Sequence, residues 1–173
     1  MDFLVLRLIH VLAGAFWLGA AITMFVFLQP TARATAPEGQ RFMLHLLRDR
    51  RFSEVVLAAA LLTGMSGAIL FWRVTGGLRL ELMTQPGNLG FTVGAVAGGI
   101  ALGLFLFVGY PAGRRLVVIG NRLEAERRPP SEAEQGILAA TQRLLTRVGA
   151  TVLALLAVAA AAMATARYWP LML

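Results

Sequence analysis

The 173-residue chain is too apolar for an ordinary soluble domain, because 58% of its residues are hydrophobic and only 14% are charged, against about 25% charged in average globular proteins. The formal charge of +7 rests on 16 arginines and no lysine, and these arginines gather between apolar runs, which favours lipid headgroups over nucleic acid as the partner. The absence of cysteine excludes disulfides, thiolate catalysis, c-type haem attachment and iron–sulfur clusters.

The first apolar run, about residues 3–28, is expected to be an uncleaved membrane span. It lacks a positively charged start and is far longer than the roughly 7–15 apolar residues of a signal peptide. The run carries Arg7 and His10. An ionisable side chain inside a span is costly, and it is therefore a functional hypothesis by default.

A shorter stretch, about residues 38–51, has the pattern of an amphipathic helix at the membrane interface. Arg41, His45 and Arg48 recur at helical spacing on one face, and apolar residues lie between them. We expect this segment to lie along the lipid headgroups.

Three further runs, about residues 54–73, 89–111 and 148–168, are each close to the roughly 20 helical residues needed to cross a bilayer. Only helices satisfy their own backbone hydrogen bonds in that setting. The sequence therefore predicts an all-α fold: a single membrane domain, residues 1–173, forming an integral membrane four-helix bundle.

Residues 112–147 predict a protruding cytoplasmic helical hairpin between the third and fourth spans. Pro129 and Pro130 end one helix, and Ser131 with Glu134 forms the capping-box pattern that starts the next. The third helix is expected to continue into this hairpin, with a kink at its internal proline. Five apolar residues are available for the seam of the hairpin: Val117, Leu123, Ile137, Leu138 and Leu144.

The arginines predict the orientation of the spans. The connections at 29–53 and 112–147 hold five and seven of them, and four lie on the other side: Arg7, Arg73, Arg79 and Arg167. The positive-inside rule places both long connections in the cytoplasm and both termini outside. This is the arrangement of a multi-pass protein of a bacterial-type inner (plasma) membrane.

Small residues inside the spans predict close helix packing. Gly94, Gly98 and Gly99 have small-xxx-small spacing in the third span, and Gly64 and Gly67 continue the pattern in the second.

His10 is the main candidate for chemistry, and three interpretations stay open: a packed polar residue, a haem ligand and a copper ligand. Gly14, one turn along, removes side-chain bulk, and Trp17, two turns along, offers an aromatic wall, as a flat cofactor requires. Arg7 lies on the same face nearer the outer surface, where its planar guanidinium group could form two hydrogen bonds to a haem propionate. Met65 and Met163 fall in the same outer layer as His10, and thioethers beside imidazole suit haem iron or Cu(I).

The segment LRLIHVLAGAFWLGAAITMFVFLQP resembles the first helix of a superfamily of small membrane proteins. That superfamily includes the copper-resistance D-type proteins, their four-helix relatives and the membrane family of oxygen-independent protoporphyrinogen oxidases. The shared features are a histidine about seven residues before a tryptophan and a small residue, here His10, Trp17 and Gly19, and a proline near the helix end, here Pro30. The resemblance implies b-type haem or copper bound through the first-helix histidine. The protoporphyrinogen-oxidising branch has a lysine in its third helix; this chain has none, so the resemblance points to the short four-helix relatives.

These observations predict a membrane b-type haem-binding protein or redox-accessory subunit that acts in electron transfer at the outer half of the membrane. If the protein is an enzyme, it is expected to be a haem-dependent membrane oxidoreductase. The alternatives are a Cu(I)-handling membrane protein and a non-catalytic structural subunit. The expected partners are the lipid bilayer and either a membrane redox complex or further copies of the chain.

Overall fold

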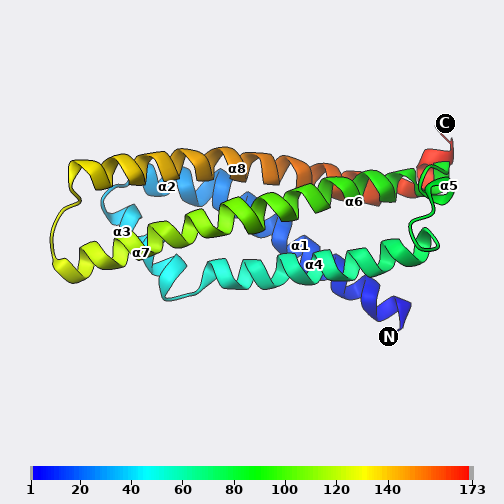
Figure 1. The fold of residues 1–173 in the computed structure, drawn as a ribbon, viewed down its shortest axis with the longest axis horizontal. Coiled ribbons are helices and arrows are strands. Elements are labelled where there is room, and N and C mark those ends of the chain that lie inside the picture. Colours follow the sequence, from blue (N-terminus) through cyan, green and yellow to red (C-terminus); the bar gives the residue numbers. More distant parts are fainter. Residues whose placement is uncertain (1, 172–173) are drawn as a thin grey trace.

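The computed structural model describes residues 2–171, and that part of the chain folds into helices (Figure 1). Four helical segments are long and apolar enough to cross a membrane: Phe3–Ala34, Phe52–Val74, Pro86–Glu126 and Glu132–Leu171. Each contains one of the four predicted spans. The all-α class and the four long apolar helices are therefore confirmed for the described residues, and three of the segments continue well beyond the predicted span at the end where the long connections lie.

The first and third long segments each contain a stretch of π-helix. The first consists of α1 (Phe3–Ile22), the π segment η1 (Thr23–Leu28) and α2 (Gln29–Ala34). The third consists of α6 (Pro86–Leu104), the π segment η2 (Phe105–Gly109) and α7 (Tyr110–Glu126).

Both π segments end two residues before a proline, Pro30 or Pro111. A proline inside an α-helix has no N–H to donate, and its ring clashes with the carbonyl group four residues back. The wider π turn moves that carbonyl group aside, and the N–H of Gln29 bonds to Met24 while that of Tyr110 bonds to Phe105. The sequence predicted a kink at Pro111, and the structure accommodates this proline with a π turn.

The remaining elements complete the bundle. They are α3 (Glu38–Arg48), α4 (Phe52–Val74), α5 (Leu80–Met83), α8 (Glu132–Thr165) and the 3₁₀-helix η3 (Ala166–Leu171). The helix predicted over about 38–51 is therefore present as α3.

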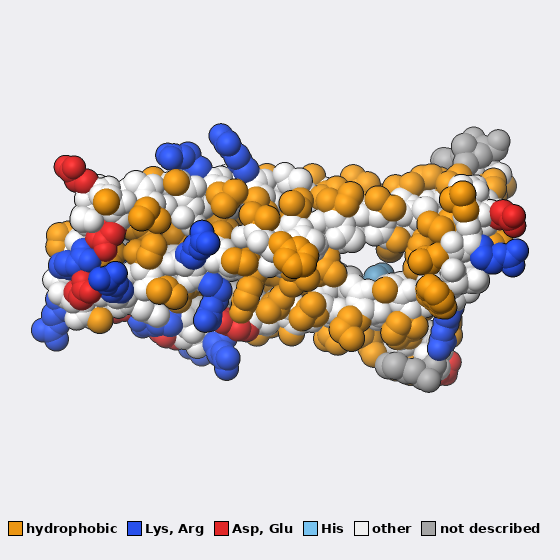
Figure 2. All heavy atoms as spheres, viewed as in Figure 1, with side chains coloured by type: hydrophobic (Ala, Val, Ile, Leu, Met, Phe, Trp, Pro, Cys, Tyr) orange, Lys and Arg blue, Asp and Glu red, His pale blue; other side chains and the backbone are white. Residues whose placement is uncertain are grey.

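The long helices pack as two pairs, α1 with α4 and α6 with α8. The beginning of α1 and η3 lie at the same end of the molecule, which we call the termini end (Figure 1). Most arginine side chains lie toward the opposite end, the arginine-rich end (Figure 2). The structure contains no membrane, so the cytoplasmic assignment of the arginine-rich end stays a prediction.

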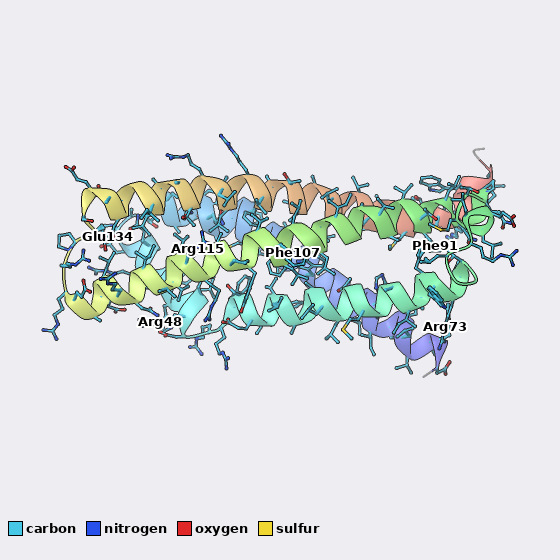
Figure 3. The ribbon with its side chains drawn as sticks, viewed as in Figure 1. Arg48, Arg73, Phe91, Phe107, Arg115 and Glu134 are labelled. Carbon is cyan, nitrogen blue, oxygen red and sulfur yellow. The ribbon has the colours of Figure 1, made fainter. Side chains whose placement is uncertain are left out.

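The two pairs meet in one apolar core to which all four long helices contribute. Its buried members are Trp17, Ala21, Val56, Ala59, Ala60, Ala101, Val152 and Leu156. The residues that α4 contributes lie in its first turns, so this core sits toward the arginine-rich end. Phe107, in η2, faces outward instead and is 82% exposed near the middle of the molecule (Figure 3).

Glycines allow close approach where helices cross, as the small-residue pattern predicted. A Cβ atom added at Gly94 would lie 2.5 Å from Met163, and one at Gly64 would lie 2.5 Å from Leu102. Gly99 has no neighbouring atom within 4 Å of such a position, so the prediction is wrong for that residue. Gly90, which the pattern did not single out, lies against the backbone of α8, because a Cβ atom added there would lie 2.7 Å from the carbonyl oxygen of Ala162.

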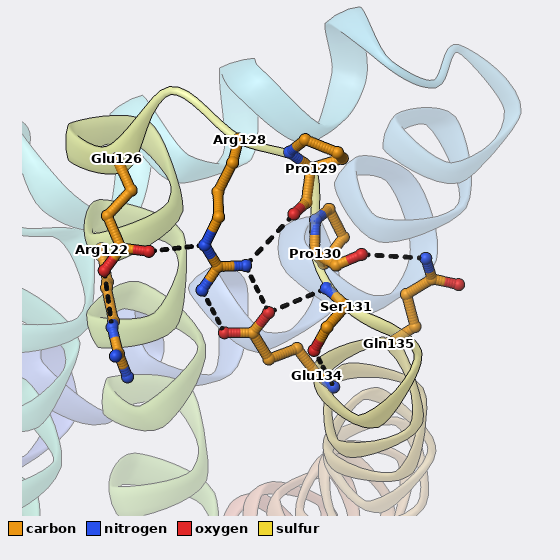
Figure 4. Close-up of polar contacts among 8 residues, drawn as sticks. All are labelled: Arg122, Glu126, Arg128, Pro129, Pro130, Ser131, Glu134 and Gln135. Carbon is orange, nitrogen blue, oxygen red and sulfur yellow. Dashed lines mark hydrogen bonds and ion pairs between the residues drawn. The ribbon is translucent and has the colours of Figure 1, made fainter.

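The turn between α7 and α8 is held by the predicted capping box (Figure 4). The backbone N–H of Ser131 donates to Glu134 over 2.8 Å, and the N–H of Glu134 donates to the Ser131 hydroxyl over 3.3 Å. Arg128 adds a two-pronged contact, with nitrogen–oxygen distances of 2.6 and 2.8 Å to the Glu134 carboxylate. These bonds, Arg128 foremost, hold the pKa of Glu134 well below its usual range.

The predicted seam of the α7–α8 hairpin is wrong in two residues. Ile137 is 54% exposed and Leu144 is 43% exposed, so neither lines an interface. The inner face of α8, followed back from the buried Leu156 and Val152 in steps of three and four residues, passes through Leu138, which the sequence also placed in the seam. Whether the hairpin protrudes from a membrane stays a prediction.

Candidate functional site

His10 lies between α1 and α4, where its ring contacts the backbone of the second span. Its Nδ1 atom is 2.9 Å from the carbonyl oxygen of Thr63 and 3.4 Å from the hydroxyl oxygen of Ser66. A carbonyl oxygen only accepts hydrogen bonds, so Nδ1 carries the proton and donates it. In the neutral imidazole the lone pair is then on Nε2. A backbone carbonyl group orients many metal-binding histidines in this way.

Gly67 creates the space for the imidazole. A Cβ atom at this position would lie 2.7 Å from Cε1 of His10 and 3.0 Å from Nδ1, closer than real Cβ contacts. Only glycine therefore lets the ring lie against α4 in this position. The hydroxyl group of Ser66 donates to the carbonyl of Leu62 and is buried beside the ring.

An opening separates the two helix pairs on the side of the core nearer the termini end. Figure 2 shows it between the α6–α8 pair and the α1–α4 pair, with histidine atoms visible at its edge. The chain has two histidines, and α3, which carries His45, lies at the arginine-rich end (Figure 1). The histidine at the opening is therefore the one on α1.

Trp17 closes this region on the side of the arginine-rich end. It is 2% exposed, and its ring centroid lies 6.0 Å from that of Phe105 in η2. Seven residues separate it from His10, or about 10 Å along the helix axis. Trp17 thus belongs to the core beneath the opening and does not stack beside the imidazole.

Gly14 is occupied in helix packing. A Cβ atom at Gly14 would lie 3.4 Å from the methyl group of Thr63, which is an ordinary van der Waals contact, so α4 borders this position directly. The space that the sequence assigned to a flat cofactor is filled by α4 at this level. Arg7 is exposed near the start of α1, and no hydrogen bond or ion pair ties it to the described residues.

The structure does not bring Met65 together with His10. Met65 is 65% exposed, and it is two residues, about 200° of helix rotation, away from Gly67, which faces the imidazole. Met163 packs over Gly94 between α8 and α6. Over residues 2–171 no group of three or more histidine, aspartate or glutamate side chains is placed to hold a metal ion.

Sequence reasoning missed the α4 side of this site. Thr63, Ser66 and Gly67 all meet the α1 face that carries Gly14 and His10. The signal was present as the run TGMSG, residues 63–67, whose two hydroxyl groups and two glycines interrupt an apolar span. Three of those five residues recur at helical spacing, which indicates one face.

His45 has a separate environment at the arginine-rich end. Its Nδ1 atom lies 2.5 Å from Asp49 in the next turn of the chain. Arg48 donates to the same carboxylate, and this bond holds the pKa of Asp49 below its usual value. The two histidines lie at opposite ends of the molecule, so they do not form a bis-histidine site.

The chain matches no protein-family model, no curated protein and no solved structure.

Proposed function

We propose that the protein is an integral membrane protein that binds b-type haem through His10 and serves in electron transfer, as a redox-accessory subunit or a haem-dependent oxidoreductase. The observation that carries the proposal is the bond from His10 Nδ1 to the Thr63 carbonyl oxygen, 2.9 Å long. This bond leaves the basic Nε2 atom as the nitrogen able to coordinate iron.

The residues of the opening fit a haem in part. The imidazole has the orientation of a ligand, and it lies beside an opening between two helix pairs (Figure 2). Gly14 is used for packing and Trp17 lies in the core, so neither supports a cofactor in the way the sequence suggested. The proposal therefore rests on His10 and the opening, together with the resemblance of the first helix to haem- or copper-binding membrane proteins.

The chain's own residues would hold and shield the group. Haem, when bound, supplies one-electron transfer. The carbonyl group of Thr63 fixes the tautomer of His10 and makes its unprotonated nitrogen a stronger metal ligand. The Trp17–Phe105 contact closes the opening toward the arginine-rich end, and this limits water access from that side. A partner of the redox chain would be a membrane complex or a further copy of the protein.

The orientation that goes with this proposal has both termini outside an inner membrane. The twelve arginines of the two long connections favour the cytoplasm for the arginine-rich end. His10 then lies in the outer half of the membrane.

An optical spectrum of the protein purified in a nonionic detergent, with and without added hemin, tests the proposal. We expect a Soret band that His10→Ala removes. His45→Ala is the matched control and keeps the band, because it removes the other histidine at the far end. No Soret band in the wild-type protein, even with hemin, refutes the proposal.

Metal analysis of the same preparation separates the remaining alternatives. Copper without porphyrin absorption would favour the Cu(I)-handling function, for which the separation of Met65 from His10 gives no support. Neither metal, with a lower stability of His10→Ala, would favour a structural subunit in which His10 joins α1 to α4.

A further inference from the structure

A cavity of about 560 Å³ lies at the arginine-rich end, between α3 and the end of α7. Four arginines, one histidine, one glutamate and two leucines line it: Arg41, Leu44, His45, Arg48, Leu123, Glu124, Arg127 and Arg128. The three polar residues that the sequence placed on one face of α3 all belong to this lining. They therefore line an open depression between α3 and the end of α7.

Two contacts hold the walls of the cavity together. A Cβ atom at Gly120 would lie 3.0 Å from Leu44, so the glycine lets α3 approach α7 closely. Arg48 forms an ion pair with Glu124 over 2.5 Å and a second with Asp49 (Figure 3 labels Arg48). These carboxylates hold the pKa of Arg48 above its usual value, so its charge is fixed.

The acidic residues neutralise two of the four arginines. Arg48 is paired with Asp49 and Glu124, and Arg128 is paired with Glu126 and Glu134. Arg41 and Arg127 have no carboxylate within 4.0 Å among residues 2–171. The lining therefore includes two arginines without an ion-pair partner among residues 2–171.

Arg127 also occupies a position that favours glycine. It ends α7 with φ of 48°, in the left-handed region, where a side chain costs about 1–2 kcal/mol.

We propose that this cavity binds a phosphate-bearing anion, held mainly by Arg41 and Arg127. A guanidinium group offers a planar pair of donors that matches two phosphate oxygens. Cavities of about 300–1,000 Å³ typically hold small molecules, so a volume of about 560 Å³ accommodates more than one inorganic phosphate. The phosphate group belongs either to a phospholipid headgroup or to a free phosphorylated compound.

The proposal is tested on the full-length protein in nonionic detergent, in two parallel measurements. Titration with pyrophosphate followed by calorimetry probes a free phosphate compound. Native mass spectrometry of the protein in mixed micelles of phosphatidylcholine and phosphatidylglycerol probes retention of an anionic headgroup. Binding in the first measurement identifies a free compound as the source, and selective retention of phosphatidylglycerol in the second identifies the lipid.

Two variants and one control decide whether the cavity is responsible. Arg127→Gly removes a guanidinium group and also relieves the backbone, so unfolding does not explain a loss of binding. We expect Arg127→Gly and Arg41→Gln each to weaken binding about tenfold. Arg143→Gln, an exposed arginine of α8 outside the cavity, should bind like wild type. The proposal is overturned if wild type binds neither probe, or if the cavity variants bind like Arg143→Gln.

Discussion

Arg33 donates a hydrogen bond to the hydroxyl group of Thr146 over 2.6 Å and thereby joins the α1–α4 pair to α8. Arg114 lies on the segment that continues from α6 through η2, and it makes a second contact between the two pairs, with 3.2 Å between its Nη1 atom and Glu54 of α4. Each arginine comes three residues after the proline of its own segment. Both contacts lie on the arginine-rich side of the core, so the pairs are fastened there and separate toward the end where His10 lies.

Replacing His10 by asparagine separates the two roles of the imidazole. The asparagine amide can still donate to Thr63, but it has no nitrogen lone pair for a metal. We expect His10→Asn and His10→Ala both to lose haem, measured as the haem-to-protein ratio. His10→Ala should in addition lose about 1 kcal/mol of stability in detergent unfolding, which His10→Asn largely recovers. Retention of haem in His10→Asn would place the ligand elsewhere.

Gly67→Ala should displace the imidazole. Its new Cβ atom would lie 2.7 Å from Cε1 of His10, so α1 and α4 must move apart or the ring must turn. We expect a loss of about 1–3 kcal/mol in the free energy of unfolding, measured in detergent. Gly99→Ala is the control, because nothing lies within 4 Å of its added atom. Equal stability of the two variants would contradict this packing.

Acidification should loosen the turn at the start of α8. Arg128 lowers the pKa of Glu134 in the folded protein, so the carboxylate stabilises the turn at pH values above about 4.3, the unfolded value. This contribution is lost as the pH falls through the lower folded pKa. The protection of residues 127–136 against hydrogen exchange, expressed relative to the intrinsic exchange rate at each pH, should therefore fall at low pH. Glu134→Gln should show the faster exchange already at pH 7, and a wild-type rate for that variant would refute the assignment.

Arg7→Lys tests whether this residue binds an anion such as a haem propionate. Lysine keeps the charge but loses the planar pair of donors. We expect normal expression and topology with weaker haem retention, measured by competition with apomyoglobin. Unchanged retention would leave Arg7 as a residue that extends to the outer headgroups.

Reporter fusions test the orientation. A reporter fused after Leu173 should be active in the periplasm, and one inserted next to Pro130 should be active in the cytoplasm. The opposite pattern would place His10 in the inner half of the membrane, although the four helices would be unaffected.

Hydropathy was sufficient to predict the four long helices, because burial in lipid requires about 20 apolar residues whatever their neighbours are. The capping box at Ser131 was equally predictable, since its hydrogen bonds are local. Pairing of the helices was not, because glycines such as Gly94 and Gly99 look alike in sequence and only one is at a contact. The orientation of Met65 depends on which face of α4 meets α1, and hydropathy does not specify this in an apolar helix.

The candidate functional site was likewise only partly predictable from the sequence. His10 stood out because an imidazole in a span is rare, but its partner Thr63 acts through a backbone oxygen that every residue possesses. The cavity at the arginine-rich end joins α3 to the end of α7, so only its α3 face was visible as a helical pattern.

The two π segments constrain the length of the chain. A π turn closes its hydrogen bond over five residues where an α turn uses four, so each segment holds one residue more than a regular helix of the same shape. Deleting that residue alone would restore the regular helix and, with it, the clash at Pro30 or Pro111. If the proline were also replaced by another residue, the deletion would restore the regular helix without a clash. The extra residue and the proline therefore depend on each other. A homologue that has lost one of them should also have lost the other.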